Sequence, residues 1–233
     1  MRNIVHAGLI FTLATVVPPS PLAGQTRTAQ PQSRAAASRT PEHGRREDWQ
    51  RVPDIFAALG AKAGSRIADL GAGEGWLTLR LARQVEPGGR VFASDISERS
   101  LITIAGTLAT AKLDNVELLL AEDDDPRLPY GTLDGVVILN AYHEMAKRVP
   151  VLDGVKRALK PGGVLVIVDN VPTDSLGTRK EQMNRHGLAL ALARDDLEAQ
   201  GFEIVSSAPD FITRQTEGST HREWMLVARR VAK

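Results

Sequence analysis

The segment of the chain best suited to bind a ligand is Asp69–Gly75, which reads Asp-Leu-Gly-Ala-Gly-Glu-Gly and follows a short apolar run. Glycine permits positive φ angles and lets a ligand approach the main chain closely. A helix that begins near Trp76 would direct its unpaired N–H groups into the same space. These features predict a ligand-binding turn between a strand and a helix. A dinucleotide fingerprint needs glycine where Trp76 stands, which argues against a nicotinamide-dependent oxidoreductase.

A second candidate is Asp95, which ends the run Val91–Asp95 and lies 20 residues after Gly75. A carboxylate at such a strand end can accept strong hydrogen bonds from both hydroxyls of an adenosine ribose. Its alternative role is that of a helix N-cap, because Glu98 three residues later would complete a capping box. Together with the glycine-rich turn, the position of Asp95 favours the ribose interpretation.

The fourth apolar run is followed by Asn140, Tyr142 and His143, which are candidates for the reacting end of a site. Ordinary packing of a loop and a helix start is the alternative for each of them. His143 and Glu144 also begin the metalloprotease pattern His-Glu-x-x-His, but Lys147 occupies its last position. We therefore predict no metal site.

The elements that must position these residues alternate between strand and helix patterns. Short apolar runs predict buried strands, and apolar residues at helical spacing predict amphipathic helices between them. This alternation is typical of a parallel sheet with helices on both faces, where ligands bind beyond the carboxyl ends of the strands. The strands are predicted at residues 66–70, 91–93, 116–120, 135–139, 164–168, 202–205 and 224–227, and the helices at 52–59, 77–85, 101–108 and 152–159.

The order and spacing of these motifs resemble those of class I S-adenosylmethionine-dependent methyltransferases over residues 48–230. The motifs that carry the resemblance are Asp69–Gly75, Asp95, the acid-rich segment Leu120–Pro126, the segment Leu133–Met145 and the turn Leu159–Gly163. The chain is most similar to bacterial methyltransferases that share its Asp-Trp-Gln lead-in at residues 48–50 and its Tyr-His-Glu stretch. The resemblance implies an α/β fold, a Rossmann-like three-layer sandwich with a mostly parallel seven-stranded sheet whose last strand is antiparallel.

The resemblance also assigns roles to individual residues. It implies that S-adenosylmethionine is the cofactor and that Glu122 or Asp123 reaches the adenine amino group. It places His186 near the acceptor, with a surface or capping position as the alternative. Either His143 or His186 could act as a base towards a hydroxyl acceptor. The predicted catalytic residues are Tyr142, His143 and His186, and the predicted cofactor-binding residues are Asp69, Gly71, Ala72, Gly73, Gly75, Asp95, Ile96, Glu122, Asp123 and Asn140.

The amino-terminal end differs in composition from the rest of the chain. Residues 1–24 combine a basic start, an apolar run too short to span a membrane, and small residues near position 24, which predicts a secretory signal peptide. Residues 25–47 are polar and lack an apolar period, which predicts a disordered linker. Residues 48–233 are left for the methyltransferase domain. We therefore expect a periplasmic or secreted protein, and a cytoplasmic protein is the alternative.

Composition narrows the function further. A chain of 233 residues with 42% apolar residues suits one domain, and a net charge of +1 gives no sign of a nucleic-acid-binding stripe. The sequence holds no cysteine, which excludes disulfides and thiolate catalysis. We predict methyl transfer to a small-molecule acceptor, without nucleic acid or stable membrane insertion. The alternative is a non-catalytic module of the same fold that binds or senses S-adenosylmethionine.

Overall fold

A computed structural model of the chain describes residues 42–173, 177–216 and 219–231. The signal peptide predicted at residues 1–24 and the predicted linker up to residue 41 lie outside the described residues. Within the described part of the chain, no helix is both long and apolar enough to cross a bilayer.

The first described element is helix α1 (Glu42–Trp49), so the prediction of a disordered linker was wrong for residues 42–47. The helix lacks an apolar stripe and is stabilised by polar side chains instead. The Arg46 guanidinium lies over the ring of Trp76, 4.3 Å from its centroid, and Glu47 forms an ion pair with Arg80. A search for apolar periodicity misses a helix of this kind because its contacts are made by charged residues.

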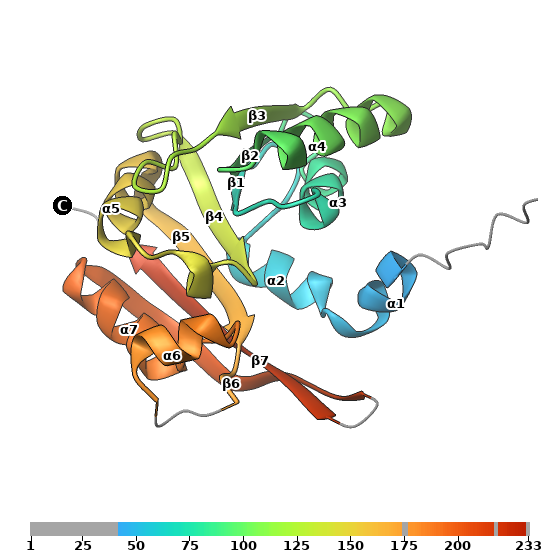
Figure 1. The fold of residues 1–233 in the computed structure, drawn as a ribbon. Helices are drawn as coiled ribbons and strands as arrows, with labels where there is room; N and C mark the ends of the chain where they lie inside the picture. Colours follow the sequence, from blue (N-terminus) through green and yellow to red (C-terminus); the bar gives the residue numbers. More distant parts are fainter. Residues whose placement is uncertain (1–41, 174–176, 217–218, 232–233) are drawn as a thin grey trace, which may run out of the picture. The chain divides into compact units, whose positions relative to one another are not determined.

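The sheet has seven strands in the order β3-β2-β1-β4-β5-β7-β6 (Figure 1). Neighbouring strands from β3 to β5 pair in parallel, and β7 pairs antiparallel with both β5 and β6. This arrangement confirms the predicted fold class. The strands are β1 (Arg66–Leu70), β2 (Arg90–Asp95), β3 (Val116–Leu120), β4 (Leu133–Leu139), β5 (Leu159–Asn170), β6 (Phe202–Thr216) and β7 (Ser219–Arg230).

Helices cover both faces of the sheet, and alternate residues of each central strand face opposite layers. In β4, Val137 and Leu139 belong to the apolar cluster formed with α2 and α3, whereas Val136 and Ile138 pack in the cluster that contains α5 and α7. This alternation follows from the two-residue period of a strand. The helices are α2 (Val52–Leu59), α3 (Trp76–Gln84), α4 (Glu98–Ala111), the 3₁₀ helix η1 (Tyr142–Glu144), α5 (Arg148–Ala158), α6 (Arg179–Asn184) and α7 (Leu190–Ala199).

Three local predictions differ from the structure. The two closing strands are much longer than predicted, because pairing between β6 and β7 continues through polar residues and two register shifts that interrupt the apolar alternation. Leu159 begins β5 and does not end the preceding helix, since its backbone is extended with ψ 142°. Strand β3 is only partly buried, because it forms one edge of the sheet.

Candidate functional site

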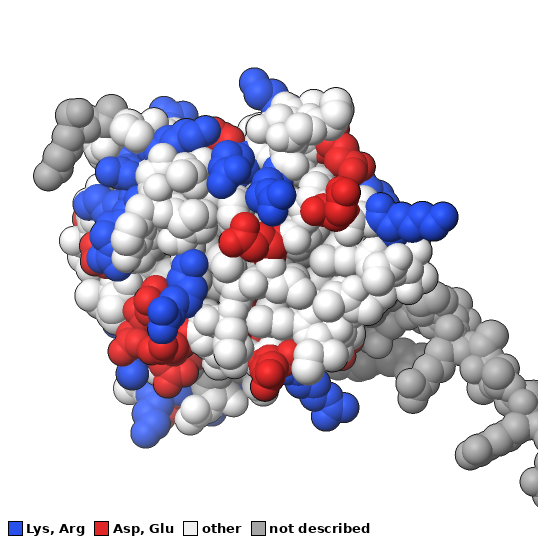
Figure 2. Space-filling model, turned by 90° about the horizontal axis from the view of Figure 1, so that it is seen from above, with Lys and Arg blue, Asp and Glu red and all other residues white. Residues whose placement is uncertain are grey.

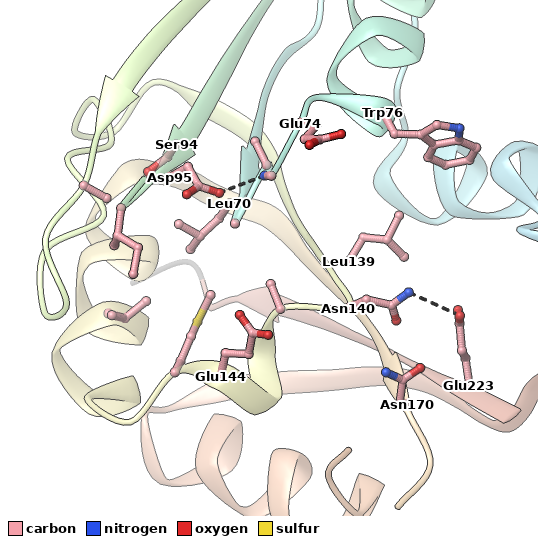
Figure 3. Close-up of a pocket in the computed structure, with 18 of the residues that line it drawn as sticks. Leu70, Glu74, Trp76, Ser94, Asp95, Leu139, Asn140, Glu144, Asn170 and Glu223 are labelled. Atoms are coloured by element: carbon pink, nitrogen blue, oxygen red, sulfur yellow. Dashed lines mark hydrogen bonds between the residues drawn. The ribbon is translucent and has the colours of Figure 1, made fainter. Parts of the chain in front are cut away.

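A cavity of about 1740 Å³ opens beyond the carboxyl ends of β1, β2 and β4. Leu70, Ser94, Asp95, Leu139 and Asn140 contribute to its wall (Figure 3). The volume exceeds the roughly 300–1,000 Å³ of a typical small-molecule site, so it has room for a cofactor and a second molecule. The predicted cofactor residues that line the cavity are Gly71, Ala72, Gly73, Asp95, Ile96, Glu122, Asp123 and Asn140.

The glycine-rich turn is held against the end of β2. Gly71 donates its N–H to the Ser94 carbonyl at 2.8 Å, and Gly73 donates its N–H to Oδ2 of Asp95 at 2.7 Å. Gly71 has φ 75°, and a Cβ added there would lie 2.5 Å from the Ala141 Cβ. Gly73 has φ 53°, but a Cβ added there would meet no atom within 4 Å. The first glycine is therefore required for packing, whereas the second keeps the backbone open towards the cavity.

Asp95 lies at the edge of the cavity and holds the turn in place. Its Oδ1 accepts the N–H of Ser97 at 2.8 Å, and its Oδ2 accepts the N–H of Gly73. The N-cap of α4 is Ser97, whose hydroxyl accepts the N–H of Ser100, so the capping role considered for Asp95 belongs to Ser97. Because each carboxylate oxygen has two acceptor sites, Asp95 keeps one on each oxygen for a ligand.

Two predicted cofactor residues lie behind the cavity wall and do not line the cavity. Asp69 is buried and accepts a hydrogen bond from the Thr78 hydroxyl at 2.6 Å. Burial raises the pKa of Asp69 to about 6, although the Thr78 hydrogen bond opposes this shift. Gly75 is the N-cap of α3 with φ 81°, and a Cβ there would lie 2.7 Å from Ile104. Both residues shape the turn from inside the protein.

The acid-rich segment after β3 brings Glu122 and Asp123 to the cavity. Glu122 forms an ion pair with Arg127, and its backbone pairs with Asp125 in a tight turn. Among the described residues, Asp123 has no hydrogen-bond or ion-pair partner. Asp124 pairs with Lys147 at 3.2 Å and does not line the cavity. Asp123 is thus the carboxylate of this segment whose acceptor capacity is unused.

A polar cluster closes the cavity at the far end from the acid-rich segment. Glu223 of β7 is fully buried and accepts hydrogen bonds from Gln50 at 2.7 Å and from Asn140 at 3.2 Å. Its Oε1 also lies 2.9 Å from Nε2 of His221. Figure 3 shows Glu223 and Asn170 lying near Asn140 on this side. The cluster joins residues of β5 and β7 with the residues that directly follow α1 and β4.

Four polar atoms of residues that line the cavity have no partner among the described residues. They are Nε1 of Trp76, Nε of Arg214 and the Oδ1 atoms of Asn140 and Asn170. A buried polar group without a hydrogen bond is costly, so such groups at a cavity wall indicate a missing ligand or water. Two donors and two acceptors match a ligand that carries both a carboxylate and an ammonium group.

The three residues predicted to be catalytic do not line the cavity. Tyr142 is buried and donates its hydroxyl to Asp196 at 2.9 Å; burial, reinforced by Asp196, raises the pKa of Tyr142 well above its usual range. His143 is buried with Nδ1 2.7 Å from Asp169. Burial alone would lower the pKa of His143, but the contact with Asp169 outweighs this and raises it. His186 is exposed and lies beside His143.

The structure also brings residues to the site that sequence analysis missed. Of the histidines whose side chains are described, His221 alone lines the cavity. Arg46, Trp49, Arg214 and Glu223 line it as well. The Asp-Trp-Gln lead-in at residues 48–50 was a sequence signal that the α1 region contributes to the site. Nothing in the local sequence pattern of β7 indicated that its side chains line the cavity.

Comparison with known proteins shows which family the central part of the chain resembles. Residues 67–163 match a family model described as a methyltransferase domain. This part of the chain is therefore similar to methyltransferase domains. The matched residues include the glycine-rich turn, Asp95 and the acid-rich segment, which contribute to the cavity wall.

The names of curated relatives of this domain specify different methyl acceptors. A demethylmenaquinone methyltransferase of Symbiobacterium thermophilum is 34% identical over 127 residues, 54% of this chain and 50% of that protein. An arsenite methyltransferase of Halobacterium salinarum is 32% identical over 167 residues, 67% of this chain and 41% of that protein. The chain therefore spans about half, or less, of the length of these relatives.

The fold of the methyltransferase domain also has close counterparts among solved structures. An S-adenosylmethionine-dependent methyltransferase from Aquifex aeolicus aligns with a TM-score of 0.66 at 23% identity. The alignment covers 81% of this chain and 93% of that one. This similarity supports the fold of the methyltransferase domain.

On the face shown in Figure 2, Lys and Arg side chains are interspersed with Asp and Glu side chains.

Proposed function

We propose that this protein transfers the methyl group of S-adenosylmethionine to a small-molecule acceptor. The observation that carries the proposal is the pairing of the glycine-rich turn with Asp95, whose carboxylate retains acceptor sites at the cavity edge. A family model for methyltransferase domains matches this region of the chain. The size of the cavity allows cofactor and acceptor to be bound together.

The residues at the wall fit the three parts of the cofactor. Asp95 is assigned to the ribose hydroxyls, and Asp123 to the adenine amino group because its carboxylate has no competing partner among the described residues. The unpaired N–H of Trp76 suits a carboxylate, and the unpaired amide oxygens of Asn140 and Asn170 suit an ammonium group. Donors and acceptors therefore match an amino acid at one end and an adenosine at the other.

For methyl transfer, the protein has to align the reacting groups more than it has to activate them. When bound, S-adenosylmethionine supplies a methyl group on a positively charged sulfur, which is already a good electrophile. The rigid turn and the strand ends hold the reacting groups in line, and such positioning supplies roughly 7–11 kcal/mol of barrier reduction. Strand ends are suited to this task because the buried sheet restricts their movement.

If the acceptor is a hydroxyl, His221 is the residue that we assign as the base. It borders the cavity, and Nε2 contacts buried Glu223 at 2.9 Å, which orients the imidazole and leaves Nδ1 available. The sequence had suggested His143 or His186, which do not line the cavity. An acceptor that is already a nucleophile would bind beside His221 without proton transfer.

Small molecules are the proposed acceptor class because the relatives include a demethylmenaquinone methyltransferase and an arsenite methyltransferase. The absence of cysteine means that an acceptor cannot be held by a thiolate of this chain. The acceptor must therefore be bound by the oxygen, nitrogen and aromatic groups of the cavity.

The proposal is tested by incubating the purified protein with isotopically labelled S-adenosylmethionine in an extract of its own cell. Mass spectrometry should detect a labelled methyl group on a small molecule and formation of adenosylhomocysteine. Binding of the cofactor without any labelled product, in extracts prepared under several growth conditions, would favour the alternative of a non-catalytic binding module.

We also propose that the protein is exported, on the basis of the composition of residues 1–24. The test is to fuse residues 1–30 to a reporter enzyme that is active only outside the cytoplasm, with Leu9 and Leu13 replaced by Arg in the control. Activity of the fusion and loss of activity in the control are expected. An inactive reporter in both fusions would argue for a cytoplasmic protein.

A further inference from the structure

Three side chains with metal-binding atoms meet beside the cavity, on its η1 side. His143, Glu144 and His186 each offer one ligand atom, and these atoms all lie within 4.8 Å of one another. Nε2 of His143 is 3.7 Å from Oε1 of Glu144, and the two imidazole rings meet edge to face. Ligands of a tetrahedral zinc ion, with bonds of about 2.0–2.1 Å, lie about 3.4 Å apart. Small rotations of the exposed Glu144 and His186 side chains would reach this spacing.

The buried ligand is already oriented by a carboxylate. Asp169 is fully buried, and its Oδ1 lies 2.7 Å from Nδ1 of His143. Its Oδ2 accepts the backbone N–H of His143, also at 2.7 Å. With the proton on Nδ1, the lone pair of Nε2 points to the side where Glu144 lies. A carboxylate behind the other ring nitrogen is the usual arrangement for a metal-binding histidine.

The exposed histidine is held by its backbone. His186 has φ 55°, an uncommon conformation for a residue with a side chain, and its carbonyl accepts a hydrogen bond from Asn170 at 2.9 Å. The next residue, Gly187, packs so closely that a Cβ there would lie 2.9 Å from the Pro172 Cα. This packing keeps His186 beside His143, and strained backbone of this kind is concentrated at functional sites.

We propose that His143, Glu144 and His186 form a binding site for a divalent transition-metal ion of the zinc type. Two imidazoles and one carboxylate are ligands that such an ion accepts, and three protein ligands leave one position open for water or another molecule. Glu144 also lines the cavity, so the ion would lie at the cavity wall. Metal binding can be tested without reference to methyl transfer.

The test uses full-length protein without a histidine tag, freed of metal by a chelator that is then removed. Zn²⁺ is titrated by calorimetry, and Co²⁺ is added separately so that its visible absorption reports the ligands. One Zn²⁺ per chain is expected to bind. Glu144→Gln and His186→Ala each change an exposed side chain, so both variants should fold and each should weaken Zn²⁺ binding at least tenfold.

His221→Ala is the matched control, because it removes a histidine that also lies near a glutamate but outside the cluster. It should bind Zn²⁺ as the unaltered protein does. The proposal is overturned if the unaltered protein binds no stoichiometric Zn²⁺, or if Glu144→Gln and His186→Ala retain full affinity. It is also overturned if His221→Ala abolishes binding. Adenosylhomocysteine affinity, measured in parallel, separates failure of this site from failure of the proposed cofactor site.

Discussion

At the scale of single residues, the role of a carboxylate in this site depends on what already surrounds it. Asp95 is the last residue of β2 and Asp69 the last but one of β1, and both were predicted to bind the cofactor. Asp95 borders the cavity, whereas Asp69 is buried under the turn with Thr78. The first is therefore expected to affect ligand affinity and the second to affect stability.

Asp95→Asn should weaken binding of adenosylhomocysteine by about 10- to 100-fold, because hydrogen bonds to a charged acceptor contribute about 1.5–3 kcal/mol. Calorimetric titration measures the change. Asp124→Asn is the control, since Asp124 lies on the surface, pairs with Lys147 and does not line the cavity. Equal affinity in the two variants would contradict the assignment of Asp95 to the ribose.

Asp69 should make the free energy of unfolding depend on pH. Its pKa is raised to about 6 in the folded protein from 3.8, so its contribution is fully present below about pH 4 and is lost as pH rises through about 6. The loss amounts to about 3 kcal/mol at most. Urea unfolding between pH 4.5 and 7.5 should show a smaller decline for Asp69→Asn than for the unaltered protein.

Thr78→Val supplies the opposite variant, because it removes the hydroxyl that lowers the pKa of Asp69. The decline in stability should then extend to higher pH. If all three proteins decline in parallel, Asp69 is not the group that titrates.

At the scale of elements, the turn between β1 and α3 shows that glycines in one motif have different tasks. Gly71 and Gly73 both have positive φ, which most residues adopt only at a cost. They differ in surroundings, since only Gly71 faces another side chain closely. The turn thus combines a packing constraint with an open surface.

Gly71→Ala should destabilise the protein by about 2–4 kcal/mol, from backbone strain together with the close approach to Ala141. Gly73→Ala should cost only about 1–2 kcal/mol, from backbone strain alone. It should nevertheless weaken adenosylhomocysteine binding, because the new methyl group stands in the cavity wall. Thermal unfolding and calorimetry together test this, and a more stable Gly71→Ala than Gly73→Ala would refute it.

At the scale of the whole molecule, the site is closed by parts of the chain that are far apart in sequence. Gln50 follows α1 and Glu223 lies in β7, yet their side chains share a buried hydrogen bond. Glu223 stands opposite Asn170 in the antiparallel pairing of β5 and β7. The far end of the cavity thus depends on both the start and the end of the domain.

Removing residues 1–41 should leave thermal stability and adenosylhomocysteine affinity close to those of the full chain, because α1 is retained. Removing residues 1–50 should lower both, since Glu223 loses the Gln50 hydrogen bond and Trp76 loses the Arg46 contact. A buried charge without its partner costs about 1–3 kcal/mol, equivalent to about 2–12 °C for a domain of this size. Similar behaviour of the two truncated proteins would show that α1 is dispensable.

The sequence by itself determined the order of the seven strands and of helices α2 to α5, the glycine-rich turn, and the carboxylates of Asp95 and the acid-rich segment. These features are local, because a strand end and the turn that follows it are consecutive in the chain. Apolar periodicity was sufficient to predict β1 at Arg66–Leu70 and α2 at Val52–Leu59 with the bounds that the structure has.

Only the tertiary structure decided which side chains face the cavity and which face the core. His143 and His221 are both polar residues near strand ends, but packing turns the first towards buried Asp169 and leaves the second at the cavity wall. Helix α1 and the register of β7 against β5 were equally out of reach, since both depend on contacts between residues 30 or more positions apart in the chain. The assembled sheet sets the direction in which each side chain points and the pairing of strands that are distant in the chain. A local sequence pattern contains neither.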